Sequence, residues 1–291
     1  MQAQTHTHRL GDGRTLAWTE AGESSGRVVF AFHGLPGSRF QRHPDEAIAR
    51  GRGLRLIHLE RPGFGLSSPL PHRRLEDWPR DVAALADALG IARFAVLGIS
   101  GGGPFALACA ALLADRVRRA AVVSGVAPPA DMQGDMSWAA RAAFFLAAHA
   151  AWLLRPVLLA GAHAATRFPS RFLDTVASQM SPPDRPILAR PQIRAMLEQD
   201  VAAAFAQGPD GVLRDLVLYA RPWNLPLDSI RCPTAFWHGT RDRMVPDSAS
   251  RGLARIVAPG ELRLVEGQGH FMVFDRWAEI VDWLASQHPS R

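Results

Sequence analysis

The residues best suited to chemistry form one short motif, Gly98-Ile99-Ser100-Gly101-Gly102, which matches the pattern G-x-S-x-G. An apolar run at 93–97 precedes the motif, and a stretch rich in alanine and leucine at 104–114 follows it. This order predicts a strand, a sharp turn and a helix, with the serine hydroxyl standing clear of the sheet at the turn. We therefore predict that Ser100 is a catalytic nucleophile. The alternative is a serine that only caps the helix.

A serine hydroxyl is a weak nucleophile at neutral pH, so it needs a histidine as general base and a carboxylate that orients the histidine. In hydrolases with this serine turn, the chain order is serine, acid, histidine. After Ser100, Asp242 follows an apolar run at 234–238, and His270 follows another at 262–265. If both runs are strands of one parallel sheet, both residues lie at its carboxyl edge, where open α/β sheets bind ligands. We predict the triad Ser100, Asp242 and His270.

Each partner of Ser100 also has a structural interpretation. Asp242 can bond its own backbone in a turn, and a single histidine among the 11 of this chain can simply be structural. His33 and His238, at the ends of apolar runs, are expected to bond nearby backbone. Three other aspartates are substitute candidates for the acid: Asp131, Asp228 and Asp247.

The intermediate of an acyl transfer carries an oxyanion, which backbone N–H groups can stabilise. One donor is expected to be the N–H of Gly101, directly after the nucleophile. The other is expected from the segment His33-Gly34-Leu35-Pro36-Gly37, which follows an early apolar run. Leu35 is the natural donor there, because proline has no N–H. The alternative is that this segment is a plain Pro/Gly turn.

Apolar runs and helical periodicities alternate along most of the chain, and this predicts an α/β fold with a mostly parallel sheet covered on both faces. The expected strands are the runs 28–32, 54–59, 93–97, 120–124, 234–238 and 262–265, preceded by a hairpin at 9–18. The expected helices are 44–50, 78–89, 104–114, 248–256 and 277–285. We assign residues 1–125 and 229–291 to this core.

Residues 126–228 contain no convincing strand, so we expect a helical cap, or lid, inserted into the core. The first part, 138–165, is strongly apolar, but Arg141, His149 and Arg155-Pro156 interrupt it, which argues against a membrane span. We expect two short helices separated at Arg155-Pro156, and a loop around the prolines between 182 and 191.

The apolar stretch of the cap has more large side chains than one core-facing stripe needs. Some of them are therefore expected to face Ser100 and bind an apolar part of the substrate. The candidates are Phe144, Phe145, Trp152 and Leu153. The alternative is that these residues only pack the cap onto the core or form an interface in a homodimer.

The composition narrows the classes of function. The net charge of +6 comes from arginine alone, because the chain has no lysine, and this excludes Schiff-base and lysine general-base mechanisms. The arginines are scattered, so we expect no nucleic-acid partner. Cys109 and Cys232 suit a reducing compartment and form neither a metal-ligand cluster nor a disulfide framework. With no signal-peptide core at the start of the sequence, we expect a cytoplasmic protein that uses no metal and no cofactor.

The chain resembles the α/β-hydrolase fold superfamily, in the serine-nucleophile branch with a His-Gly-x-Pro-Gly oxyanion loop. The collinear matches are His33 to Gly37, Arg61-Pro62-Gly63-Phe64-Gly65-Leu66-Ser67, the Ser100 motif, the Asp242 segment and Gly269-His270. The resemblance implies an eight-stranded, doubly wound sheet with a helical cap over the site. Family members often carry aspartate where this chain has Glu60.

We expect a serine hydrolase that cleaves an ester or related acyl bond of a small apolar substrate through an acyl-enzyme. Epoxide hydrolases and haloalkane dehalogenases of this fold attack with an aspartate, so Ser100 disfavours both. Carbon–carbon hydrolases of ring-cleavage type, cofactor-free haloperoxidases and a non-catalytic ligand receptor remain alternatives. A proline iminopeptidase needs acidic cap residues. Glu198 and Asp200 could serve, although Ala202-Ala203-Ala204 beside them suggests an ordinary helix with a solvated face.

Overall fold

An eight-stranded sheet forms the centre of the computed structural model, which describes residues 4–132, 136, 138–258 and 260–286. The strand order is β1-β2-β4-β3-β5-β6-β7-β8. The strands are β1 (Thr5–Arg9), β2 (Thr15–Gly22), β3 (Arg27–Phe32), β4 (Leu54–Leu59), β5 (Phe94–Ile99), β6 (Val117–Val123), β7 (Thr234–Gly239) and β8 (Gly260–Val265). β2 pairs antiparallel with β1 and β4, and all other pairs are parallel. The predicted α/β class and mostly parallel sheet are confirmed.

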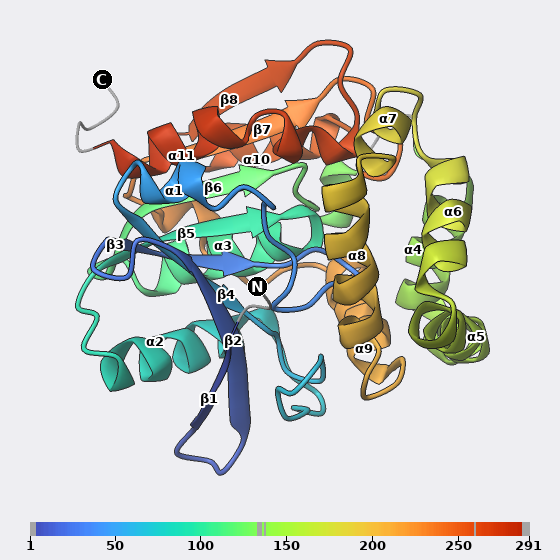
Figure 1. Cartoon of the computed structure of the whole chain (residues 1–291), viewed down its shortest axis with the longest axis horizontal. Helices are drawn as coiled ribbons and strands as arrows, with labels where there is room; N and C mark the ends of the chain where they lie inside the picture. Colours follow the sequence, from blue (N-terminus) through green and yellow to red (C-terminus); the bar gives the residue numbers. More distant parts are fainter. Residues whose placement is uncertain (1–3, 133–135, 137, 259, 287–291) are drawn as a thin grey trace.

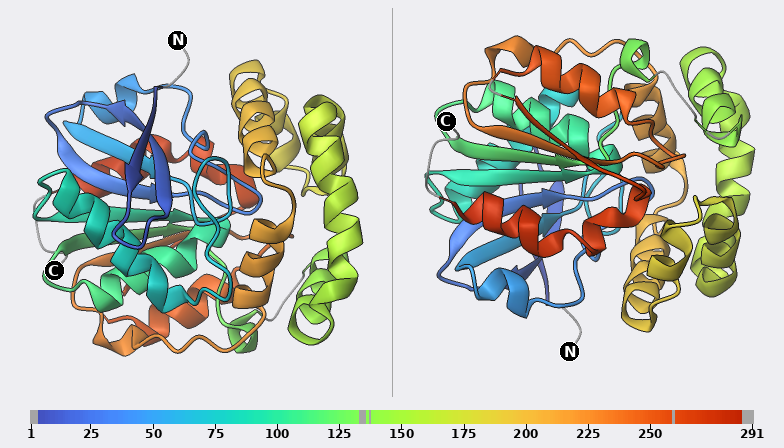
Figure 2. Two further views of the ribbon diagram at one scale, coloured as in Figure 1. Left: turned by 90° about the horizontal axis from the view of Figure 1, so that it is seen from below. Right: turned by 90° about the horizontal axis from the view of Figure 1, so that it is seen from above.

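Helices cover both faces of the sheet (Figure 2) because each central strand is apolar on both sides. In β3, Val29 and Ala31 pack toward one helix layer, and Phe30 and Phe32 toward the other. The first layer contains α1 (Ala47–Arg50) and α11 (Trp277–Ala285). The second contains α2 (Trp78–Ala88), α3 (Gly103–Leu112) and α10 (Ser248–Ile256).

One core helix is shorter than expected. The prediction placed a helix at 44–50, but α1 begins only at Ala47. The carboxylate of Asp45 accepts the N–H of Ala47 at 3.0 Å, so the residues before the helix form a side-chain turn instead.

Between β6 and β7, the described residues form helices and no strand. They are η3 (Pro129–Asp131), α4 (Trp138–His149), η4 (Ala151–Leu153), α5 (Leu154–Arg167), α6 (Pro169–Gln179), α7 (Asp184–Leu188), α8 (Pro191–Ala204), α9 (Asp210–Tyr219) and η5 (Leu227–Ser229). The helices α4 to α9 lie beyond the carboxyl ends of the parallel strands (Figure 1). None of the helices in the described ranges is both long and apolar enough to cross a membrane.

Several prolines of the cap lie in the first turns of its helices. The expected break at Arg155-Pro156 is wrong, because Pro156 lies in the first turn of α5, where a missing N–H costs no hydrogen bond. The break falls earlier, between α4 and η4. Pro186 and Pro191 likewise lie in the first turns of α7 and α8, so the expected loop is partly helical.

Candidate active site

Ser100 occupies a sharp turn between β5 and α3. Its φ of 52° lies in the left-handed region that non-glycine residues rarely adopt. Two glycines of the motif permit this turn. A Cβ atom at Gly98 would lie 2.4 Å from the carbonyl oxygen of Gly102, and one at Gly102 would lie 2.1 Å from the carbonyl oxygen of Phe32. The spacing of small residues in the motif therefore reflects close backbone approach on both sides of the serine.

The structure brings the three predicted catalytic residues into hydrogen-bond contact. His270 Nε2 lies 3.0 Å from Ser100 Oγ, and His270 Nδ1 lies 2.6 Å from Asp242 Oδ2. The other oxygen of Asp242, Oδ1, accepts the N–H groups of Met244 and Val245 at 2.8 and 3.0 Å. Asp242 thus bonds its own backbone in a turn, as its structural interpretation expected. It also contacts His270.

Charge and burial set the protonation of this pair. Burial alone would raise the pKa of Asp242, but the adjacent His270 and the hydrogen bonds from His238 and His270 hold it well below its ordinary value. Burial would lower the pKa of His270, but the charge and hydrogen bond of Asp242, together with the charge of Asp184, raise it above the ordinary value. Asp242 is therefore a carboxylate at neutral pH, as an orienting residue must be.

Asp184, on α7 of the cap, holds the backbone of the histidine loop. Its Oδ1 accepts the N–H of Phe271 at 2.7 Å, and its Oδ2 accepts the N–H of His270 at 3.1 Å and the hydroxyl of Ser181 at 2.6 Å. The side chain is 1% exposed. Sequence reasoning missed this residue. The Ser181-x-x-Asp184 spacing is typical of a helix start, but it gives no hint of a contact 86 residues away.

The segment expected to supply an oxyanion donor lies against the serine turn. A Cβ atom at Gly34 would lie 3.4 Å from that of Ser100, and one at Gly101 would lie 3.1 Å from that of Leu35. Gly101 is in the first turn of η2 (Ser100–Gly102), where N–H groups lack an intrahelical acceptor. Both expected donors, Leu35 and Gly101, therefore flank the nucleophile.

Asp200 of α8 ties the cap to this segment. Its Oδ1 accepts the N–H and the hydroxyl of Ser38, each at 2.7 Å, and its Oδ2 accepts Gln41 Nε2 at 3.3 Å. Gln41 Oε1 in turn accepts the N–H of Gly34 at 2.6 Å. Burial and the charge of Glu60 raise the pKa of Asp200 to about 7, against hydrogen bonds from Ser38 and Gln41. The expectation that Asp200 belongs to a solvated helix face is wrong, because it is fully buried.

A second buried network supports the same segment from α9. Asp215 pairs with Arg61 at 2.8 Å and with Arg73 at 2.6 Å. Arg61 donates to the carbonyl oxygens of His33 and Gly34. His33 Nε2 accepts the N–H of Arg61, and burial together with the charge of Arg61 lowers the pKa of His33 well below its ordinary value. His33 therefore stays neutral and bonds nearby backbone, as expected.

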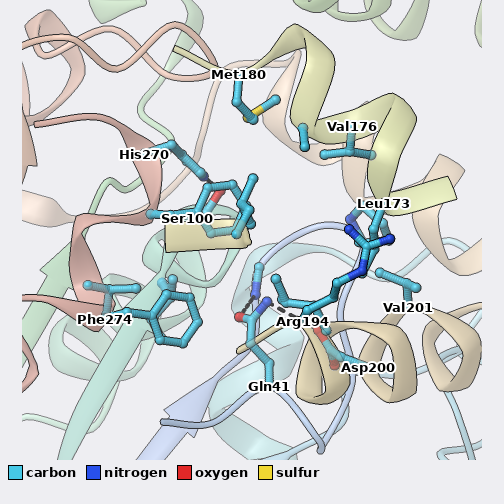
Figure 3. A pocket seen from close by; sticks show the side chains of 18 of the residues that line it. Gln41, Ser100, Leu173, Val176, Met180, Arg194, Asp200, Val201, His270 and Phe274 are labelled. Carbon is cyan, nitrogen blue, oxygen red and sulfur yellow. Dashed lines mark hydrogen bonds between the residues drawn. The ribbon is translucent and has the colours of Figure 1, made fainter. Parts of the chain in front are cut away.

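Ser100 and His270 border a cavity of about 360 Å³ between the sheet and the cap. Figure 3 shows Met180, Val176 and Leu173 of the cap across the cavity from Ser100 and His270, with Gln41 and Asp200 at the lower side of the view. Most of the cap lining is apolar and comes from the segments of α6 to α8: Phe172, Leu173, Val176, Ala177, Met180, Leu188, Leu197 and Val201. This composition suits an apolar substrate.

The four cap residues expected to line the pocket do not line it. Phe145, Trp152 and Leu153 are 64%, 73% and 43% exposed, and Phe144 packs against the core cluster on the α2, α3 and α10 side of the sheet. The reason is the layering of the cap: α8 and α9 lie between the sheet and the helices α4 and α5 (Figure 2). The alternative that these exposed side chains form an interface between two copies stays a prediction.

The described residues contain no group of three or more His, Cys, Asp or Glu side chains that could hold a metal ion. Cys109 and Cys232 are both free thiols, and burial raises the pKa of each.

Comparison with known proteins agrees with this fold. The family model of the alpha/beta hydrolase fold matches residues 27–276. A solved alpha/beta hydrolase fold protein from Nakamurella multipartita is 28% identical, with a TM-score of 0.67 over 97% of this chain and 99% of that one. An esterase from Rhodococcus sp. is 20% identical, with a TM-score of 0.70 over 99% of both chains.

One curated relative, the dihydrolipoyllysine-residue acetyltransferase component of the acetoin cleaving system of Pseudomonas putida, is 34% identical over 116 residues. That match covers 38% of this chain and 30% of the relative, so the chain corresponds to under a third of it. The family match, in contrast, spans most of the sequence, including the serine turn and the strands β3 to β8. The chain therefore belongs to the alpha/beta hydrolase fold family.

Proposed function

We propose that the protein is a serine hydrolase that cleaves an ester or related acyl bond of a small, mostly apolar substrate. The observation that carries the proposal is the contact chain from Ser100 through His270 to Asp242, which opens into an apolar cavity. The structural similarity to a Rhodococcus esterase is consistent with it.

The proposed reaction follows from the geometry. His270 Nε2 takes the proton of Ser100 Oγ as the oxygen attacks the carbonyl carbon of the ester. The oxyanion of the tetrahedral intermediate is stabilised by the N–H groups of Leu35 and Gly101. Collapse breaks the bond to the alcohol oxygen, which receives the proton from His270 Nε2 and leaves an acyl-enzyme. Water, deprotonated by the same nitrogen, then attacks the acyl group and releases the carboxylic acid and the free serine.

A carbon–carbon hydrolase of ring-cleavage type would need a free cation for its substrate carboxylate, and among the arginines at the cavity only Arg185 makes no ion pair in the described ranges, since it donates to the carbonyl oxygen of Ser178 at 3.4 Å. Arg42 already pairs with Glu46 at 2.6 Å, and Arg194 pairs with Asp174 at 2.8 Å and with Glu198. An uncharged acyl ester makes no such demand.

The test compares p-nitrophenyl esters with ring-cleavage diketones as substrates of the wild type and of Ser100→Ala. We expect ester hydrolysis in the wild type and a loss of about 10⁴-fold or more in kcat for Ser100→Ala. Ser25→Ala, an exposed serine between β2 and β3, is the matched control and should keep full activity. Turnover of diketones alone, or ester hydrolysis that survives Ser100→Ala, would contradict the proposal.

A further inference from the structure

His58 borders the same cavity as Ser100 and has an unused ring nitrogen. It is the fifth residue of β4, and only 3% of its surface is exposed. Its Nε2 atom is buried and meets no hydrogen-bond partner in the part of the chain that the structure describes. A buried polar atom without a partner is rare, because it has lost its water without replacement.

The chemistry of that nitrogen can be assigned. Burial and the charge of Arg42 lower the pKa of His58 to about 3, against a raising hydrogen bond with the Gln41 backbone. The imidazole is therefore neutral at neutral pH and carries one proton. A hydrogen bond that raises the pKa of a histidine is donated by its ring, and Nε2 has no partner, so Nδ1 carries the proton toward the Gln41 backbone. Nε2 is therefore a hydrogen-bond acceptor to which no described residue donates.

A second residue of the cavity lining, Trp277, has a hydrogen-bond donor that is not used within the described residues. Trp277, at the start of α11, is 3% exposed, and its Nε1 also has no partner among the described residues. The tryptophan and His58 lie on the α1–α11 side of the sheet, where His43 stacks on Trp277 with ring centroids 5.5 Å apart. The neighbouring polar side chains are occupied, because His43 bonds the carbonyl of Phe274 and Gln41 bonds Gly34 and Asp200.

We propose that His58 and Trp277 form a subsite for a hydroxyl group on the non-reacting part of the substrate. A hydroxyl both donates and accepts, so it can give its proton to His58 Nε2 and accept the N–H of Trp277. The inference rests on the proposed acyl hydrolase function and deepens it: the substrate class is an apolar ester that carries an alcohol or phenol group.

The experiment uses p-nitrophenyl esters of phenylacetic and 3-phenylpropanoic acid with a 4-hydroxyl, 4-methyl or 4-methoxy group. The two chain lengths vary the reach, and the common leaving group keeps the chemistry equal. We expect kcat/KM for the hydroxyl ester to exceed that for the methyl ester by about tenfold in at least one series. The methoxy ester, which accepts but cannot donate, should fall between them.

His58→Leu and Trp277→Phe should each reduce the hydroxyl preference to about twofold or less, while the rate on the methyl ester reports that the variant is folded. His58→Gln, which restores an acceptor, should recover part of the preference. His163→Leu, an exposed histidine of α5, is the matched control and should leave it unchanged. The subsite would be overturned if the ratio of kcat/KM for the hydroxyl ester to that for the methyl ester were near one in both series of the wild type. It would also be overturned if a preference for the hydroxyl ester survived in both His58→Leu and Trp277→Phe.

A binding measurement separates this inference from the proposed function. Calorimetry on Ser100→Ala with 4-hydroxyphenylacetamide and 4-methylphenylacetamide needs no turnover. Tighter binding of the hydroxyl compound that is lost in Ser100→Ala/His58→Leu supports the subsite even if no ester is hydrolysed. Equal binding of the two compounds contradicts it even if the esters are substrates.

Discussion

In the proposed reaction, the protonation of His270 determines the pH at which Ser100 can react, because only a neutral imidazole can take the serine proton. Burial would lower the pKa of His270, but Asp242 and Asp184 raise it above 6.5. We therefore expect kcat/KM to rise with pH through one ionisation that lies above about pH 6.5. A pH profile from about 5 to 9 measures it.

The control for that profile is Asp200→Asn, because the pKa of Asp200, about 7, lies inside the pH range of the measurement. The inflection should persist in this variant if it belongs to His270. A rise centred below about pH 6, or one that disappears in Asp200→Asn, would show that another group governs the reaction.

Asp200 should make the stability of the fold fall as the pH rises. Its pKa is about 7 in the folded protein, compared with 3.8 for an unperturbed aspartate. A carboxyl with a raised folded pKa stabilises the fold fully below the unfolded value, and this contribution disappears as the pH rises through the folded value. Between about pH 4 and 7, we expect the wild type to lose about 2 to 4 kcal/mol more unfolding free energy than Asp200→Asn.

Urea unfolding at several pH values tests this difference. Asp174→Asn, at an exposed cap aspartate paired with Arg194, is the control and should follow the wild type. If the unfolding free energies of the wild type and Asp200→Asn changed with pH by the same amount, the burial of this carboxyl would not influence folding.

At the scale of elements, α7 positions the histidine loop through Asp184. Replacing this carboxylate by an amide in Asp184→Asn removes one acceptor and the negative charge near the ring. We expect kcat to fall by about tenfold or more with little change in KM, because the histidine is misplaced while the cavity is intact. We also expect the inflection of the pH profile to move to lower pH, because the charge of Asp184 raises the pKa of His270.

Asp184→Glu, which keeps the charge, should leave the inflection near the wild-type value even if kcat falls. A loss of kcat without any shift of the profile in Asp184→Asn would show that the residue only supports the loop structurally.

The parallel strands and the contact of Ser100 and Asp242 with His270 could be predicted because their signals are local. Strands such as β3 are unbroken apolar runs, and the turn at Ser100 needs small residues at fixed spacing. Asp184 and Asp200 could not be predicted, because each acts across 86 or 162 residues on a backbone that no local pattern identifies. The four cap residues expected to line the pocket were misplaced for a related reason. An excess of apolar residues predicts that a helix packs against other elements, but it does not predict which layer of the cap the helix occupies.

For the whole molecule, the cavity between cap and sheet should select the length of the acyl chain. Each methylene buried there is worth about 0.8 kcal/mol, so two more carbons should raise kcat/KM about tenfold until the space is filled. Leu197→Trp should shift the optimum of a p-nitrophenyl ester series to shorter chains, because Leu197 lines the cavity.

The exposed residues Phe145 and Trp152 provide the matched controls. Their replacement by alanine should leave the chain-length profile unchanged, because neither lines the cavity. A profile that changes in these variants but not in Leu197→Trp would place the substrate elsewhere.

The central claim is that Ser100 is the nucleophile, and the most direct measurement is the site of a covalent adduct. Diethyl p-nitrophenyl phosphate transfers a diethylphosphoryl group to an activated serine and releases p-nitrophenol. We predict one equivalent of p-nitrophenol per chain and, by peptide mass spectrometry, one adduct on Ser100 that is absent in Ser100→Ala. An adduct on a different residue, or ester hydrolysis that continues undiminished after Ser100 is fully modified, would contradict the account.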